Sequence, residues 1–383
     1  MTIKKELLFF MFIAFLSTVN AQSLIKKTLL WDGNAREYSI YIPASYDGSV
    51  DFPLLFNFHG GGGNIASQIQ IADMRPIADT ANFILVYPQA FPDPTDGGST
   101  NWIRKAPTTF DDVPFVGAMI DSISSDYKIN SNRVYACGYS LGGELTYELA
   151  CRLNNRIAAI GAVARTMGTD AFNNCTPTHP TGVMTILGTE DNTSPYEGLV
   201  WGGVKYYLSA DEVHDYWANH NQCDTIVDIE SIPNTDPSDG SSVERHSWSM
   251  NKCVLVEHLK VIGGGHDWPG SFGNMDIDAS EEIWNFVSRY DLNGVLKCKI
   301  TSREENSQIP ISIKVYPNPV NQQFSIESNL LEVTEYGIYS ILGELVKSGK
   351  LNTGINTINI STLTPEIYFL KINDRYTKLI KSN

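Results

Sequence analysis

Apolar residues recur along the first three quarters of the chain in short continuous runs, separated by segments with helical spacing. Such runs are typical of strands covered on both faces. They span residues 53–58, 83–87, 157–164 and 183–187. Residues 112–127 carry apolar side chains every three to four positions and predict a helix. The alternation from residue 53 to 290 predicts an α/β fold, a mostly parallel central sheet with helices on both faces.

The pattern changes after Cys298. From residue 315 onward the sequence shows short alternating strands separated by Gly and Asn turns, without helical spacing. About 70 residues with strand signals every 8–12 positions suit a small all-β sandwich. We therefore expect an α/β domain at 22–298, a linker at 299–313 and a β-sandwich at 314–383.

The first 21 residues have the form of an export signal. Lys4 and Lys5 precede an apolar run at 7–16, and small residues end the segment at Ala21. The run is too short for a membrane span, and no later segment approaches the roughly 20 apolar residues that a transmembrane helix needs. We expect a signal peptide at 1–21 and no membrane span.

Composition narrows the classes of function. The 383 residues carry a net charge of −15, with 42% hydrophobic and 19% charged residues. The acidic balance argues against sequence-independent binding of nucleic acid, which needs basic patches, and favours an uncharged substrate. Six cysteines are compatible with disulfides in an exported protein, although spacing alone does not give their pairing. Cys137, in an apolar strand, is expected to be a buried thiol.

One stretch organises the chain chemically. Residues 138–143 read Gly-Tyr-Ser-Leu-Gly-Gly, between an apolar strand at 133–137 and a helical pattern at 141–152. Glycines two positions either side of a serine, at a switch from strand to helix, are typical of a nucleophile elbow. Ser140 is therefore the candidate nucleophile. A simple helix cap is the alternative for an exposed serine at this position.

A serine nucleophile needs a base and an orienting acid, which in this architecture follow it along the chain. Asp191 comes just after the strand at 183–187, and His266 just after a strand at 257–262. Open α/β sheets place their ligands at these carboxyl ends of strands. Glu190 and Asp267 are the nearest competitors.

The remaining histidines considered lie within a strand, along a helix or in polar loops, where a structural or surface role is expected. These are His179, His214, His220, His246 and His258.

A glycine cluster, Gly60 to Gly63, follows the strand at 53–58. It could be a flexible turn, or it could bring backbone N–H groups close to a ligand oxygen. Beside a nucleophile elbow we expect one oxyanion-hole donor here, the N–H of Gly61 with Gly62 as the fallback. The second is the N–H of Leu141, after the nucleophile. This chemistry requires no metal or other cofactor, and none is expected.

Three motifs in order resemble the secreted polyhydroxybutyrate depolymerase and feruloyl esterase group of α/β-hydrolases. They are the elbow at 138–143, Gly-Thr-Glu-Asp at 188–191 followed by Pro195-Tyr196, and Gly-Gly-Gly-His-Asp-Trp-Pro-Gly at 263–270. The resemblance covers about residues 25–295 and implies the α/β-hydrolase fold and a catalytic domain at 22–298. It departs at Leu187, where the family often has His.

The resemblance implies further residues. Trp268 is expected near the substrate, and Tyr139, beside the nucleophile, is assigned the same role. A packing role is the alternative for Trp268. Cysteines at 223 and 253 fall where related enzymes have a bridge, and 151 with 175 is a second pair.

The tail from Lys314 closely resembles the type IX secretion (type A) sorting domain of the Bacteroidetes. The resemblance rests on four segments: Val-Tyr-Pro-Asn-Pro at 315–319, Tyr-Ser-Ile-Leu-Gly at 339–343, Ile-Tyr-Phe-Leu-Lys at 367–371 and Lys-Leu-Ile-Lys at 378–381. It implies type IX machinery as a partner, export through the periplasm, cleavage of the tail, and a secreted or cell-surface protein. A carbohydrate-binding β-sandwich is the alternative, but it would need exposed aromatics.

The sequence therefore predicts a secreted serine carboxylic-ester hydrolase that uses Ser140, His266 and Asp191 through an acyl-enzyme. Its expected substrate is a polymer or cell-wall ester, with polyhydroxyalkanoate, feruloyl, acetylxylan and aromatic-polyester esters as alternatives. Peptidase activity is a weaker option. A hypothesis from another class is a non-catalytic exported binding module with the same fold.

Overall fold

The computed structural model describes residues 23–94, 97–102, 111–251, 253–296, 313–328, 333–340, 344–352, 354–372 and 375–382. The chain divides into two compact units, Met1–Cys298 and Lys299–Asn383, and each is described by itself. The predicted export signal at 1–21 and nearly all of the predicted linker at 299–313 lie outside the described residues.

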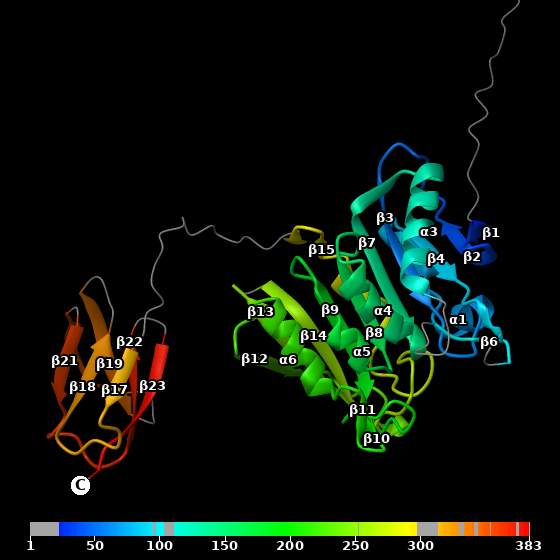
Figure 1. Ribbon diagram of the computed structural model, residues 1–383. Helices are drawn as coiled ribbons and strands as arrows, with labels where there is room; N and C mark the ends of the chain where they lie inside the picture. Colours follow the sequence, from blue (N-terminus) through cyan, green and yellow to red (C-terminus); the bar gives the residue numbers. More distant parts are fainter. Residues whose placement is uncertain are drawn as a thin grey trace, which may run out of the picture. The chain divides into compact units, whose positions relative to one another are not determined.

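A ten-stranded sheet forms the centre of the first unit, in the order β1-β2-β4-β3-β7-β8-β9-β14-β13-β12 (Figure 1). The six strands from β4 to β14 in this order are parallel, and two antiparallel strands extend the sheet at each edge. This confirms the predicted mostly parallel sheet. In sheet order, the strands are Ser23–Trp31, Asn34–Ile42, Ile84–Pro88, Phe52–Phe58, Ile129–Tyr139, Ala159–Val163, Gly182–Gly188, Cys253–Ile262, Ser242–Met250 and Val227–Ser231.

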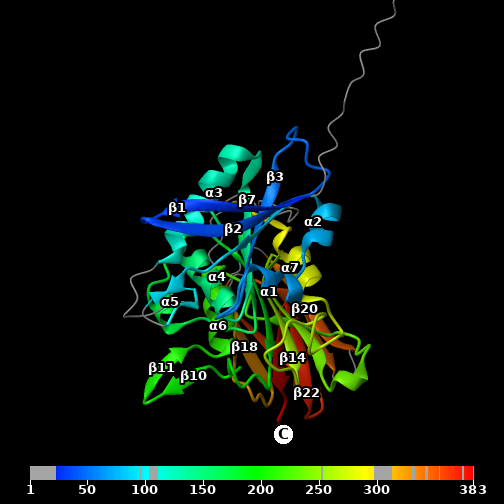
Figure 2. The ribbon, with the colours of Figure 1, turned by 90° about the vertical axis from the view of Figure 1, so that its right-hand side faces the viewer.

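Helices cover both faces of the sheet because alternate residues of the central strands point to opposite sides. Leu54 and Phe56 of β3 join one apolar core with α3, α4 and α6, whereas Leu55 joins the other with α1, α2 and α7. Figure 2 shows α3 and α4 on one side of the strands and α2 and α7 on the other. In chain order, α1 to α7 are Ile65–Ile71, Arg75–Ala81, Asp112–Asp126, Leu141–Arg152, Thr169–Asn173, Ala210–His220 and Ala279–Val287.

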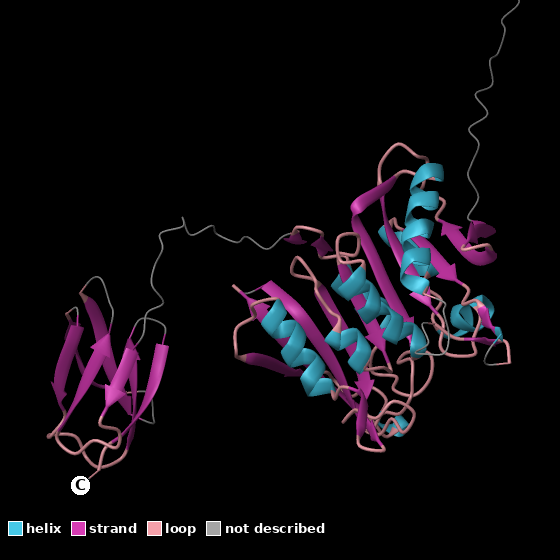
Figure 3. Ribbon diagram, viewed as in Figure 1, coloured by secondary structure: helices cyan, strands magenta, loops and turns pink. Residues whose placement is uncertain are grey.

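The pattern of apolar residues did not predict several of the exposed strands. The hairpin of β10 (Leu199–Trp201) and β11 (Val204–Tyr207) was not predicted, nor were the edge strands β12 and β13 (Figure 3). His246 consequently lies in a strand rather than in a polar loop. β11, β12 and β13 mix apolar with polar or charged residues, and β10 has only three residues, so none of them shows the long apolar run of a fully buried strand. The shorter elements are Pro92–Asp93 (β5), Ser99–Thr100 (β6), Pro237–Asp239 (η2), Tyr290–Asp291 (β15) and Gly294–Val295 (β16).

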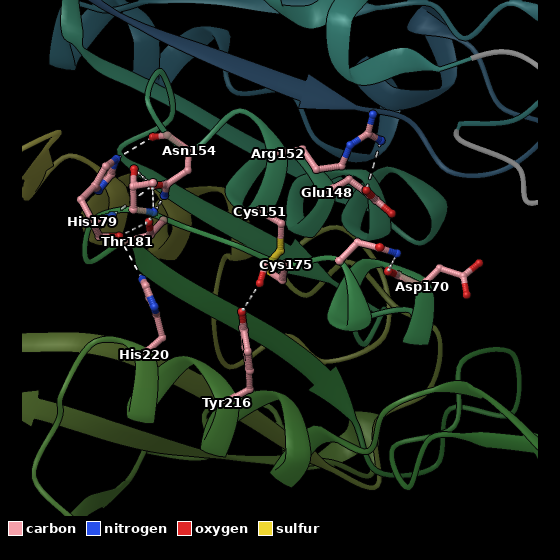
Figure 4. Close-up of a disulfide and its surroundings, with 12 residues drawn as sticks. Glu148, Cys151, Arg152, Asn154, Asp170, Cys175, His179, Thr181, Tyr216 and His220 are labelled. Atoms are coloured by element: carbon pink, nitrogen blue, oxygen red, sulfur yellow. Dashed lines mark hydrogen bonds and ion pairs between the residues drawn. A yellow bond between two sulfur atoms is a disulfide. The ribbon is translucent and has the colours of Figure 1, made fainter.

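One disulfide ties the helix after the elbow to its surroundings. Cys151, in the last turn of α4, is bonded to Cys175, which follows α5 (Figure 4). This is one of the two implied pairs. The other is wrong, because Cys223 is a free thiol while Cys253 is disulfide-bonded. Cys223 lies three residues after the end of α6, where its N–H donates to the carbonyl of Ala218 and its side chain packs against apolar core residues.

Cys137 is a fully buried free thiol, as predicted, and its burial raises the pKa of the thiol. Its sulfur lies 3.8 Å from the sulfur of Met74. The residue is therefore part of the core beneath the elbow.

The second unit consists of two antiparallel sheets, β17-β18-β21 and β20-β19-β22-β23. Phe324, Ile338 and Leu370 are buried in its separate apolar core. This arrangement agrees with the predicted small β domain. In chain order, β17 to β23 are Ile313–Tyr316, Gln323–Ser328, Thr334–Ser340, Leu345–Leu351, Gly354–Asn359, Ile367–Ile372 and Arg375–Ile380. In the described parts of both units, every helix is too short or too polar to cross a membrane.

The disulfide gives a first testable prediction. Replacing both Cys151 and Cys175 by Ser should lower the free energy of unfolding by about 3 kcal/mol, because the bridge closes a loop of 24 residues and restricts the unfolded chain. Urea unfolding of the full chain measures the change. Cys223→Ser is the matched control, since it removes a thiol without opening a bridge and should cost less. Equal losses of unfolding free energy in the two proteins would show that the disulfide does not stabilise the fold.

Candidate active site

Ser140 lies in a strained turn between β7 and α4. Its backbone angles are φ 53° and ψ −120°, a conformation that residues with a side chain rarely adopt. The flanking glycines make the turn sterically feasible. A Cβ on Gly138 would lie 2.4 Å from the carbonyl carbon of Gly142, and a Cβ on Gly142 would lie 2.3 Å from the carbonyl oxygen of Phe58. The local geometry is that of a nucleophile elbow.

A hydrogen-bonded line connects the three predicted triad residues. The Nε2 of His266 lies 2.9 Å from the Oγ of Ser140, and its Nδ1 lies 2.7 Å from Oδ2 of Asp191. An ionised carboxylate only accepts, so Nδ1 carries the proton and Nε2 is free to accept from the serine hydroxyl. The structure therefore brings Ser140, His266 and Asp191 together in the order that the prediction of nucleophile, base and orienting acid requires.

Asp191 is buried and held on both oxygens. Its Oδ1 accepts hydrogen bonds from the backbone N–H groups of Thr193 and Ser194, each at 2.8 Å. The competitor Glu190 is exposed. The other competitor, Asp267, accepts from the N–H of Gly265 and thus shapes the loop that carries the histidine. Neither competitor takes the position of Asp191 beside the imidazole.

The loops that carry the acid and the base are strapped to each other. The N–H of Glu190 donates to the carbonyl of Gly264, and the N–H of Gly263 donates to Oγ1 of Thr189, both at 2.9 Å. Gly188 makes this approach feasible, since a Cβ there would lie 2.3 Å from the carbonyl oxygen of Gly264. Hydrogen bonds to backbone groups thus hold two loops that are far apart in sequence in a fixed position relative to each other.

The glycine cluster lies against the elbow. A Cβ on Gly61 would lie 2.6 Å from Cδ1 of Leu141. Among the described residues, no protein group accepts from the N–H of Gly61, and Leu141 is the first residue of α4, where an N–H has no partner within the helix. The N–H of the fallback, Gly62, already donates to the carbonyl of Thr100 and to Oδ1 of Asn101. Among the described residues, the N–H groups left without an acceptor are therefore those of Gly61 and Leu141, the two donors predicted first for the oxyanion hole.

A buried histidine fixes the orientation of this cluster. The Nε2 of His59 accepts from the N–H of Ala90 at 3.1 Å, so its proton resides on Nδ1, which donates to the carbonyl of Gly60 at 2.7 Å. The N–H of Gly63 also donates to that carbonyl. In a trans peptide the N–H points opposite to the C=O, so the N–H of Gly61 faces away from these donors. Apart from the position of His59 before the glycines, no local pattern in the sequence pointed to this role.

The two residues predicted to bind substrate have other contacts. Trp268 is 1% exposed, and its indole N–H donates to Oγ of Ser280. The ring is enclosed in the core, which fits the packing alternative, and its expected position near the substrate stays a prediction. Tyr139 is half-buried, and its hydroxyl donates to the carbonyl of His266 at 2.6 Å. We therefore regard Tyr139 as a positioning residue that joins the elbow to the histidine loop.

A second chain of hydrogen bonds connects the strands of the sheet to the loop that carries Asp191. The Nδ1 of His258 lies near both Oγ1 and the carbonyl of Thr185, and a carbonyl only accepts, so Nδ1 carries the proton. Its Nε2 then accepts from the hydroxyl of Tyr196, five residues after Asp191. The Thr185 hydroxyl donates in turn to Nε2 of His214. This order requires both imidazoles to be neutral.

Burial lowers the pKa of these histidines, as it does for His59. The pKa falls to about 4 in His59 and to about 3 in His214, and it falls well below the ordinary value in His258. The cluster around His214 and His258 is not a metal site of the usual kind. Within the described ranges, no group of three or more His, Cys, Asp or Glu side chains is arranged to hold a metal ion.

Comparison with known proteins identifies the tail and the fold. Residues 314–382 match the family model described as the secretion system C-terminal sorting domain. The chain therefore carries this sorting domain, which indicates type IX secretion to the cell surface or the extracellular space. The acetyl xylan esterase from Aspergillus awamori superposes with a TM-score of 0.50 at 15% identity, over 69% of this chain and 99% of that one. The first unit has the α/β-hydrolase fold.

Several curated esterases resemble the first unit in sequence. The chain is 27% identical to a bifunctional acetylxylan esterase/xylanase of Neocallimastix patriciarum, over 68% of this chain and 34% of that protein. It is 28% identical to feruloyl esterase B of Piromyces equi, over 67% of this chain and 46% of that protein. It is 27% identical to a probable feruloyl esterase C of Aspergillus niger, over 66% of this chain and 84% of that protein. The chain thus spans about a third of the length of the Neocallimastix protein and about half of the length of the Piromyces protein. The predicted class, a carboxylic-ester hydrolase, agrees with these similarities.

Tyr139→Phe should slow the reaction of Ser140 with a fluorophosphonate probe by up to about 10-fold, because it removes the hydroxyl that holds the histidine loop and keeps the ring. Tyr135→Phe is the matched control: Tyr135 lies in the same strand and donates to the carbonyl of Tyr290. Both variants should lose similar thermal stability, but only Tyr139→Phe should label slowly. Equal labelling rates would reduce Tyr139 to a packing residue.

The buried neutral histidines predict a loss of stability in mild acid. In the unfolded chain these side chains titrate near pH 6.5, above the lowered pKa of His59 and His214 in the folded state. Below that pH the unfolded state binds more protons. The free energy of unfolding should therefore fall as the pH drops from about 6.5 toward 4, by up to about 1.4 kcal/mol per pH unit for each histidine. Urea unfolding across this range measures the slope.

His214→Gln provides the comparison, since it removes one of the titrating groups. Its unfolding free energy should depend less steeply on pH than that of the parent. A parent protein as stable near pH 4.5 as near neutrality would show that the imidazoles take up protons without loss of structure.

Proposed function

We propose that this chain is a secreted serine carboxylic-ester hydrolase that works through an acyl-enzyme. The observation that carries the proposal is the hydrogen-bonded line from Ser140 through His266 to Asp191. It lies beside the N–H groups of Gly61 and Leu141, which have no acceptor among the residues that the structure describes. A nucleophile, a base, an orienting acid and an oxyanion site are the parts that ester cleavage needs.

In the first half of the reaction, Oγ of Ser140 attacks the ester carbonyl carbon while Nε2 of His266 accepts the hydroxyl proton. Asp191 stabilises the imidazolium and holds its ring in place. The negative oxygen of the tetrahedral intermediate lies between the N–H groups of Gly61 and Leu141. The C–O bond to the alcohol then breaks, and His266 protonates the departing oxygen.

The second half repeats these steps with water. Nε2 of His266 takes a proton from water, and the resulting hydroxide attacks the carbonyl carbon of the acyl-enzyme. The oxyanion again lies against Gly61 and Leu141. Collapse of the intermediate releases the carboxylic acid, and the proton on His266 returns to Oγ of Ser140.

For the substrate we propose an acetyl or feruloyl ester on a plant cell-wall polysaccharide. Support comes from the names of the relatives, which are acetylxylan and feruloyl esterases. The net charge of −15 also suits an uncharged polymer better than an anionic one. Polyhydroxybutyrate and aromatic polyesters, expected from the sequence as alternatives, belong in the same substrate panel.

For export we propose that residues 1–21 direct the chain to the periplasm and that the sorting domain engages the type IX machinery and is then cleaved off. The match of residues 314–382 to the sorting domain supports this route. The ester hydrolase would then act outside the cell, where cell-wall polymers are found.

The triad is tested by substitution. Asp191→Asn should keep the fold and lower kcat on a nitrophenyl ester by about 10⁴-fold, since the imidazole loses its fixed tautomer and the charge that stabilises it. Ser140→Ala and His266→Ala should be comparably inactive, and combining them should add little. Glu190→Gln is the matched control, because Glu190 neighbours Asp191 but is exposed. If Glu190→Gln were the slower variant, the acid role would move to Glu190.

Assays of the parent protein also distinguish the proposed hydrolase from the alternative of another class, a non-catalytic binding module. A folded parent that hydrolyses none of acetylxylan, methyl ferulate, polyhydroxybutyrate and an aromatic polyester, and whose Ser140 does not react with a fluorophosphonate, would favour the binding module. Hydrolysis of one class of ester in preference to the others would identify the substrate.

A further inference from the structure

A cavity of about 410 Å³ lies between α5, β11 and α6. In the chain, α5 follows β8, whereas β11 and α6 follow β9. The volume is within the range of small-ligand sites. None of the residues in the proposed reaction lines this cavity.

Part of its lining is aromatic and apolar. Phe172 of α5 and Tyr216 of α6 meet edge to face, with ring centroids 5.2 Å apart, and Leu208 adds an aliphatic surface. Phe172 is 37% exposed, so its ring is accessible to a ligand. The two rings offer a surface on which an apolar face of a ligand can pack.

The rest of the lining is polar with little net charge. Glu212 pairs with Lys205 at 2.5 Å, which offsets both charges. Among the described residues, the side chains of Asn173, Asp215 and Asn219 form no hydrogen bond or ion pair with the protein. Asp215 and Asn219 are one helical turn apart on α6 and face the same side. They offer both acceptors and donors to a ligand rich in hydroxyl groups.

The walls of the cavity are fixed to the helix of the nucleophile. The disulfide joins α4 to the residue two positions beyond Asn173, and the hydroxyl of Tyr216 donates to the carbonyl of Cys175 at 3.5 Å (Figure 4). On the other side, Arg165 bonds to Glu144 in the first turn of α4 and lies 3.8 Å above the ring of Tyr207 in β11. These contacts fix the walls of the cavity to both ends of α4, so the cavity is preformed.

We propose that this cavity binds a pyranose ring of the polysaccharide that carries the ester. A pyranose has an apolar C–H face and a rim of hydroxyl groups, which match the aromatic pair and the unpaired carboxylate and amides. A carboxylate in the lining disfavours an anionic ligand, and a feruloyl ring has fewer hydroxyl groups than a sugar to pair with the carboxylate and the amides. This inference rests on the proposed function, and it assigns the polymer chain a subsite separate from the reacting ester.

The test compares a polymeric with a small substrate. Phe172→Ala and the double variant Asp215→Ala/Asn219→Ala should raise KM for acetylated xylo-oligosaccharides by about 10-fold and leave kcat/KM for nitrophenyl acetate unchanged, because only the oligosaccharide reaches the cavity. Asp211→Asn is the control, as Asp211 is exposed on the same helix but does not line the cavity. Equal losses on both substrates, or none on either, would overturn the proposal.

A direct binding measurement separates this inference from the proposed function. Xylohexaose, titrated calorimetrically into full-length Ser140→Ala protein, should bind, and adding Phe172→Ala should weaken binding at least fivefold. Binding of methyl ferulate that is lost with Phe172→Ala, without binding of xylohexaose, would overturn the sugar assignment. If the parent cleaves no ester but xylohexaose binding still depends on Phe172, the proposed hydrolase fails while the subsite stands.

Discussion

Close packing of backbone against backbone at Gly142 is the constraint on which the candidate site depends. Any side chain at this position would collide with the carbonyl oxygen of Phe58 at 2.3 Å. The first turn of α4 can therefore lie directly on the end of β3, which brings the elbow and the glycine cluster together. The strained conformation of Ser140 persists because the parallel strands and α4 hold both sides of the turn.

The same principle operates between the acid and the histidine. Gly188 permits the loops after β9 and β14 to share backbone hydrogen bonds, so that Asp191 and His266 are set by the sheet rather than by their own side chains. Tyr139 then ties the histidine loop to the elbow. Preorganisation of this kind keeps the reacting groups in place without cost at the moment of reaction.

Buried neutral imidazoles complete the frame. His59 and His258 each use one ring nitrogen as donor and the other as acceptor, an arrangement that only the neutral ring can provide. They orient the glycine cluster and the acid loop, and neither was singled out as functional from the sequence. A histidine in an apolar or glycine-rich segment gives no sign of its partners, because those partners are backbone groups and hydroxyls from other elements.

The sequence by itself determined the parallel sheet, the elbow, the three residues now hydrogen-bonded in line, and the C-terminal sorting domain. The sheet, the elbow and the three residues follow from local patterns: apolar runs, obligatory glycines, and residues at the carboxyl ends of strands. The sorting domain was expected because four segments of the tail resemble a known family. Only the tertiary structure decided that Trp268 is enclosed, that Tyr139 bonds to a carbonyl, that Cys223 is unpaired and that a cavity forms beside α6. Each depends on contacts between segments distant in the chain, which no local pattern encodes.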